Sequence, residues 1–78
     1  MPTYFFDVTG SEHSAADEEG SQLANVAEVR AIALDTVIEL ARRRSPSHNN
    51  IKLEVFVRDE ADVHVYKAAL TISGEWES

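Results

Sequence analysis

Apolar and polar residues alternate regularly in two stretches near the end of the sequence. In residues 51–58 every second residue is Ile, Leu or Val, and after the polar sequence Asp-Glu-Ala-Asp a second stretch spans 63–73. A period of two is typical of strands, so we predict an antiparallel hairpin over 51–73. Pairing Arg58 with Val63 gives a register in which Glu54 faces Lys67. It gathers the apolar residues on one face: Ile51, Leu53, Val55, Val57, Tyr66, Ala68, Leu70 and Ile72.

The stretch 26–44 has a helical pattern instead. Asn25 followed by Glu28 has the spacing of a capping box, and Ser45-Pro46 ends the pattern. Apolar residues occupy well over half of the helical circumference, whereas a helix on one sheet face needs an apolar stripe only somewhat wider than ~100°. The excess indicates that loops or a second subunit cover the flanks of this helix.

The rest of the chain completes an α+β domain. Residues 3–9 are rich in aromatic and β-branched residues and predict a strand, whereas 10–25 form an acidic loop that is compatible with a short edge strand near 14–17. We therefore expect one domain over 1–78, with a short acidic tail at 74–78. Its helix packs on a three- to four-stranded, mainly antiparallel sheet, in the order strand, optional strand, helix, strand, strand.

The amino-acid composition limits the classes of partner that the protein is expected to bind. Seven basic against fourteen acidic residues give a net charge of −7, which disfavours nucleic acid and anionic membranes. The one basic cluster, Arg42-Arg43-Arg44, lies where cations favour a helix C-terminus. There is no cysteine, and no apolar run approaches the ~20 residues of a membrane span. We expect a cytoplasmic protein with neither a nucleic-acid nor a membrane partner.

Candidate chemistry is sparse, so we expect no catalytic residue, cofactor or metal, and no enzyme. His13, His48 and His64 have no metal-ligand spacing, and His64 is predicted on the core-facing side of the hairpin. Arg30 falls inside the apolar arc of the helix. We interpret Arg30 and Asp17 as a structural ion pair that holds the acidic loop over the helix start.

Self-association is the leading functional hypothesis, in the form of a non-catalytic interaction module, most simply a homodimer. A chain this small has modest stability alone, and its apolar surface exceeds what one helix needs. An antitoxin-like or regulatory subunit that binds a basic protein is the alternative, and a small-ligand binder or enzyme is a further one. The candidate interface residues are Phe5, Phe56, Val63, Val65, Ile32 and Ile38.

Four short motifs resemble a family of small uncharacterised bacterial proteins, catalogued as a domain of unknown function. They are Pro-Thr-Tyr-Phe-Phe-Asp-Val at 2–8, Asp-Glu-Glu-Gly at 17–20 with Leu23, Ala-Glu-Val-Arg-Ala-Ile-Ala at 27–33, and Val-Arg-Asp-Glu at 57–60. Thr3 departs from the family, whose members have a basic residue there. The resemblance implies the layout strand, acidic loop, helix and hairpin, and it supplies no activity.

Overall fold

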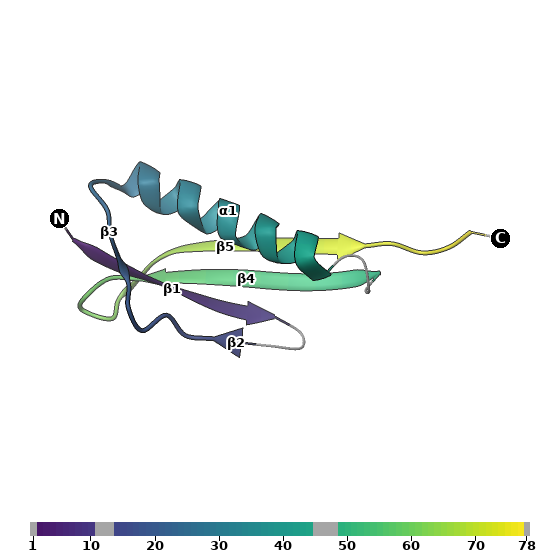
Figure 1. Ribbon diagram of the computed structural model, residues 1–78, viewed down its shortest axis with the longest axis horizontal. Helices are drawn as coiled ribbons and strands as arrows, with labels where there is room; N and C mark the ends of the chain where they lie inside the picture. Colours follow the sequence, from purple (N-terminus) through teal and green to yellow (C-terminus); the bar gives the residue numbers. More distant parts are fainter. Residues whose placement is uncertain (1, 11–13, 45–48, 78) are drawn as a thin grey trace.

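The computed structural model describes residues 2–10, 14–44 and 49–77 and consists of one helix on a five-stranded antiparallel sheet (Figure 1). The strand order is β2-β1-β4-β5, with β3 also paired to β1. The bounds are β1 Thr3–Gly10, β2 Ser14–Ala15, β3 Ser21–Gln22, α1 Val26–Arg44, β4 Asn50–Arg58 and β5 His64–Ser73. The α+β class is confirmed, with two short strands inside the segment that the sequence had assigned to the acidic loop.

The helix α1 covers the β4–β5 half of the sheet. Asn25 caps the helix as predicted, because the Glu28 N–H donates to its side chain at 3.1 Å. The Glu28 carboxylate accepts instead from Ala24 N–H at 3.2 Å, one residue before the N–H that a capping box uses. The buried line on its underside repeats every four residues and meets the inward residues of the hairpin. The core comprises Leu23, Val29, Ala33, Val37, Ala41, Ile51, Leu53, Val55, Val57 and Ala68.

The predicted hairpin register is wrong by two residues. Leu53 pairs with Leu70 and Val55 with Ala68, so Lys67 lies opposite Phe56 rather than Glu54. A shift of two leaves each side chain on its predicted face, because side chains alternate with a period of two. Lys67 still reaches Glu54 diagonally at 3.7 Å. The turn is longer than predicted, with Asp59 N–H donating to Val63 O and Asp62 in the left-handed region at φ 65°.

His64 does not face the core. The register shifts at Val57/Arg58, so that Val57 pairs with Tyr66 but Arg58 pairs with His64. Such a β-bulge leaves Val65 unpaired and reverses the alternation beyond it. His64 is exposed, with its ring centroid 5.7 Å from that of Phe56 on the face away from α1.

Candidate functional site

The most connected polar group of the described chain lies around Arg58 on the helix-free face of the sheet. Arg58 Nε donates to Asp7 Oδ2 at 2.9 Å, and Nη2 donates to the backbone oxygen of Asp17 at 2.9 Å. The guanidinium also lies 4.5 Å from the centre of the Phe5 ring, and Nη1 reaches Asp62 at 3.5 Å. Strand β4 therefore holds β1 and the 16–20 segment together through one arginine.

The Asp17 carboxylate accepts a β1 backbone hydrogen bond that a neighbouring strand would otherwise accept. Its Oδ2 accepts the N–H of Phe6 at 3.1 Å, and its Oδ1 accepts those of Glu19 and Gly20 at 3.1 and 3.0 Å. Phe6 lies on β1 between Tyr4, paired with β3, and Val8, paired with β2. The carboxylate thus satisfies the N–H that neither short strand reaches, which closes this edge of the sheet.

The charges of both carboxylates are stabilised by these bonds. Burial alone raises the pKa of Asp7, but the hydrogen bonds from Arg58 and from the Asp17 amide, with the Arg58 charge, lower it below its ordinary value of 3.8. For Asp17, burial is again outweighed, by the amides of Gly20, Phe6 and Glu19, and the pKa is lowered. The hydrogen bond to Asp7 raises the pKa of Arg58. These directions are those expected of a structural ion pair.

Gly20 fits the same closure. Its φ is +74°, and a Cβ built there would lie 2.7 Å from Thr3 Cγ2 and 2.8 Å from Phe5 Cε1. Only glycine combines this backbone conformation with so close an approach to β1. The Asp-Glu-Glu-Gly motif is therefore explained by Asp17 as acceptor and Gly20 as the close-contact turn.

The predicted Arg30–Asp17 ion pair is absent from the described chain. Asp17 is engaged by backbone amides and lies near Arg58, whereas Arg30 is exposed on α1. The β1 edge, rather than the helix start, receives the acidic loop. Sequence reasoning missed Arg58, although the alternation placed it opposite the apolar face and Val-Arg-Asp-Glu was one of the recognised motifs.

Two of the candidate interface residues, Phe5 and Phe56, lie on the helix-free face, where charged side chains lie beside them. Arg58 lies over Phe5, and Lys67 Nζ lies 5.9 Å from the Phe56 ring centre. Both phenylalanines are half-buried. The cationic groups of Arg58 and Lys67 therefore lie against both aromatic rings of this face.

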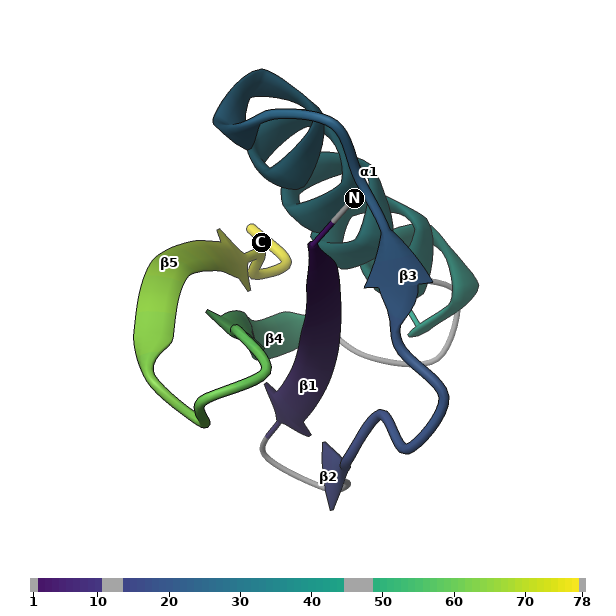
Figure 2. The same ribbon diagram turned by 90° about the vertical axis from the view of Figure 1, so that its left-hand side faces the viewer.

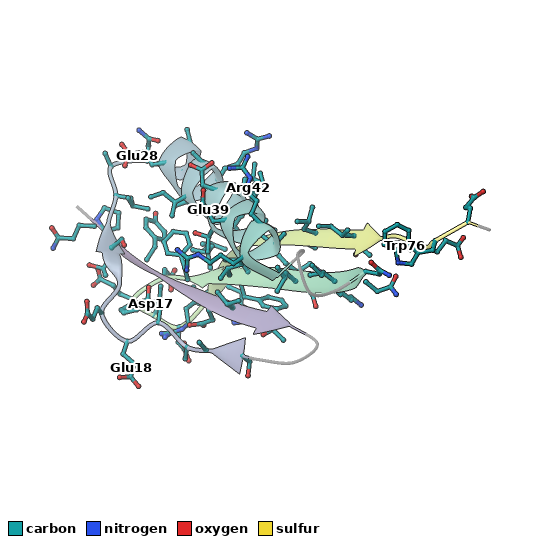
Figure 3. All side chains as sticks on the ribbon, turned by 45° about the vertical axis from the view of Figure 1, so that its right-hand side comes forward. Asp17, Glu18, Glu28, Glu39, Arg42 and Trp76 are labelled. Carbon is teal, nitrogen blue, oxygen red and sulfur yellow. The ribbon has the colours of Figure 1, made fainter. Side chains whose placement is uncertain are left out.

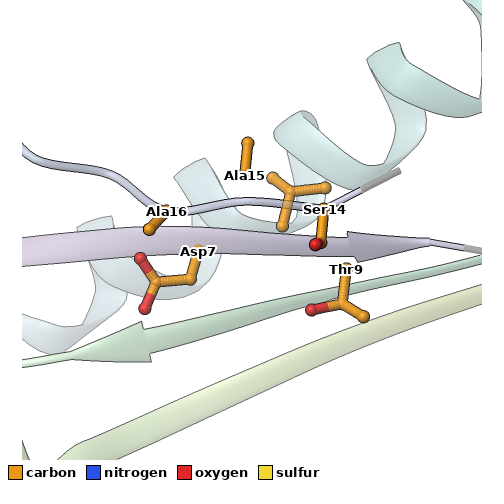
Figure 4. Close-up of a pocket in the computed structure, with 6 residues that line it drawn as sticks. Asp7, Thr9, Ser14, Ala15 and Ala16 are labelled. Carbon is orange, nitrogen blue, oxygen red and sulfur yellow. The ribbon is translucent and has the colours of Figure 1, made fainter.

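A hollow lies beside β2. It measures about 260 Å³ and is lined by Asp7, Val8, Thr9, Ser14, Ala15 and Ala16 (Figure 4). Its single titratable side chain is Asp7, which is already bonded to Arg58. A second hollow, of about 380 Å³, lies along α1 beside Ile32, Leu40 and Arg43. The second hollow also contains Asp35, Thr36 and Glu39, and the Thr36 hydroxyl donates to the Ile32 backbone oxygen at 2.7 Å.

Residues 2–10, 14–44 and 49–77 contain neither a group of metal ligands nor a membrane-spanning helix. Within these ranges no three histidine or acidic side chains are grouped closely enough to hold a metal ion. No helix in the same ranges is long and apolar enough to cross a bilayer. His13 and His48 lie outside the described residues.

The far edge of the sheet differs from the closed one, since β5 has β4 on one side and no strand from residues 2–10, 14–44 or 49–77 on the other. Gly74 N–H donates to Asn49 O at 2.8 Å, which continues the β4–β5 ladder. Because backbone groups of a strand alternate in direction, residues 66, 68, 70 and 72 bond to β4. The N–H and C=O groups of Lys67, Ala69, Thr71 and Ser73 therefore point away from the sheet.

An apolar seam runs along α1 next to that edge. Ala27, Ala31, Leu34 and Ile38 follow a 4-3-4 spacing, which is the spacing of a coiled-coil seam. Helix α1 runs in the direction of β5 (Figure 1), and viewed along it β5 lies on the left of the sheet (Figure 2). In a right-handed helix, residues that follow the buried Ala33 and Val37 by one position turn clockwise, towards β5. Ile38 is 42% exposed there, and Leu34 is half-buried.

Comparison with known proteins identifies a family for this chain. Neither the curated proteins nor the solved structures give a significant match. One family model matches residues 3–71, which span β1 to most of β5. By that match the chain belongs to the family described as Domain of unknown function (DUF6894).

Proposed function

We propose that this protein is a non-catalytic interaction module that self-associates as a homodimer, through antiparallel pairing of β5 with β5 of a second copy. The observation that carries the proposal is the ten-residue strand whose outer edge has no partner strand in the described chain. Exposed edges are normally blunted by proline, by several charges or by shortness. The β5 sequence has no proline and no acidic residue, and its one lysine forms an ion pair with Glu54 at 3.7 Å.

Two registers pair the outward backbone groups of both copies. Centred on Ala69, the pairing sets Lys67 opposite Thr71 of the second copy. Centred on Leu70, it sets Lys67 opposite Ser73. Neither register opposes two like charges, which would destabilise a cross-strand pair.

The helices also support this pairing. A two-fold axis perpendicular to the sheet keeps both helices on one face, running antiparallel. Strands lie ~4.8 Å apart and α1 packs on both β4 and β5, so a helix centred between these two strands would place the two helix axes about 10 Å apart near their centres. Packed helices are 8–10 Å apart, so the seams of the two copies come into contact. The excess apolar arc of the helix thereby gains a covering.

The test is a proline at an outward position of β5. Proline is tolerated on an edge strand where its missing N–H faces solvent. Ala69→Pro is therefore expected to fold, by circular dichroism, and to be monomeric by light scattering across a hundredfold range of concentration. Ala69→Thr keeps the N–H and is expected to remain dimeric. A monomeric wild-type chain at all concentrations contradicts the proposal, as does a dimeric Ala69→Pro.

A basic protein partner is the second candidate, and a cluster of acidic residues favours it. Exposed Glu18 and Glu19 lie in the segment held by Arg58, and Glu60 and Asp62 belong to the adjacent turn. Such a field steers basic surfaces towards this end of the molecule. Salt-sensitive recovery of one basic protein, lost in a Glu18→Lys, Glu19→Lys double variant, is the expected result. Recovery that is independent of salt and of both substitutions argues against it.

A further inference from the structure

Two unpartnered apolar features lie at opposite ends of β5. Trp76, three residues beyond the strand, is 92% exposed, and Figure 3 shows it at the end of the molecule opposite Asp17. At the other end, a cleft of about 220 Å³ is lined by Pro2, Tyr4, Val26, Val29, Asp59, Val65 and Tyr66. A strand of ten residues spans ~33 Å, so Trp76 does not reach the cleft of its own chain.

Pairing of β5 with a second β5 brings these two features together. In the Ala69-centred register Ser73 lies opposite Val65 of the second copy, and in the Leu70-centred one it lies opposite Lys67. An extended continuation then carries Trp76 past the bulge at Val65 of the second copy, to the end of β5 beside which Val65 lines the cleft. Trp76 has the parity of Tyr66, Ala68 and Leu70, so an extended chain directs it to the helix side of the sheet. The cleft opens on that side, because Val29 of α1 forms part of it.

We infer that Trp76 of each protomer docks into the cleft of the other, between the start of α1 and the β4–β5 turn, and so locks the dimer. The inference rests on the proposed self-association through β5. An exposed tryptophan gains by burying its large ring, and a buried one needs an acceptor for its indole N–H. Among the residues lining the cleft, Tyr4, Tyr66 and Asp59 carry side-chain oxygen atoms that accept such a bond.

The chain contains a single tryptophan, so its fluorescence reports this contact without labelling. As concentration rises through the dimerisation range, Trp76 emission is expected to shift to the blue and acrylamide quenching to weaken, together with the rise in mass. Val26→Asp places a charge at the mouth of the cleft, on a side chain that is 76% exposed and in a helix turn that favours acids. This variant is expected to fold and still dimerise, with loss of both the blue shift and the protection from acrylamide.

Ser14→Asp, which adds the same charge to an exposed residue on the opposite edge, is the matched control and is expected to behave as wild type. A wild-type dimer in which Trp76 stays fully quenchable overturns the docking while leaving β5 pairing in place. Protection that survives in Val26→Asp likewise overturns the assignment of the cleft. A chain that never dimerises overturns the self-association proposal and, with it, this inference.

Discussion

The two edges of this sheet are treated in opposite ways. At the β1 edge, two short strands and the Asp17 carboxylate satisfy the outward backbone groups, and Arg58 fixes the covering segment from two strands away. At the β5 edge a longer strand has no partner on its outer side within the described chain. The apolar seam of α1 lies above this edge. The comparison shows that the polar motifs of this family member serve closure of one edge. The edge that we propose for self-association is the other one, at β5, which carries few charges.

Removal of the Asp17 carboxylate is the largest expected perturbation of the closed edge. Asp17→Ala leaves the N–H groups of Phe6, Glu19 and Gly20 without their acceptor. Hydrogen bonds to a charged group contribute ~1.5–3 kcal/mol, so we expect a loss of about 3 kcal/mol in the free energy of unfolding, measured with urea. The neighbouring Glu18→Ala is the control, since Glu18 is exposed, and it is expected to change stability little. Equal effects of the two substitutions contradict the closing role of Asp17.

A methyl group at Gly20 tests the close approach of the same segment to β1. Gly20→Ala combines a left-handed backbone with clashes against Thr3 and Phe5, and we expect a loss of about 2 kcal/mol. Gly74→Ala is the matched control, because its Cβ would meet only the Asn49 backbone oxygen, at 3.5 Å. We expect that variant to be neutral by the same urea titration. Should Gly20→Ala prove as stable as Gly74→Ala, the 16–20 segment does not lie against β1 as described.

The sequence predicted the elements that follow a strong period. The helix bounds 26–44, its Asn25–Glu28 cap and the inward face of the hairpin are all confirmed. These features depend on local propensity and alternation, which neighbouring residues specify. The sequence does not determine the hairpin register in the same way, because shifts of two residues leave the faces unchanged.

The misassigned contacts all depend on long-range geometry. Asp17 was assigned to Arg30, thirteen positions away, yet it lies near Arg58 because β4 pairs with β1. His64 was placed in the core because alternation alone does not reveal a bulge at Val65. Similarly, the sequence named Phe5 and Phe56 as candidate interface residues without showing that Arg58 and Lys67 lie beside their rings. A pattern along the chain identifies faces but not the partners that meet across strands.

A substitution next to the open β5 edge is expected to change the free energy of unfolding least and to act mainly on dimerisation. Ile38 is exposed in the seam of α1, so Ile38→Lys removes little from the monomer, and its free energy of unfolding is expected to change by less than about 0.5 kcal/mol. In the proposed dimer the two seams face each other across the two-fold axis, and the new cations are desolvated close to each other. The variant dimer is therefore expected to dissociate at a much higher protein concentration than the wild-type dimer does, as measured by light scattering. Arg43→Lys lies on the other flank of the helix and does not change the charge, so it is expected to leave the molar mass unchanged.

An Ile38→Lys chain that dimerises like the wild type would contradict the predicted contact between the helices. The seam would then lie outside the interface, with β5 pairing still in place.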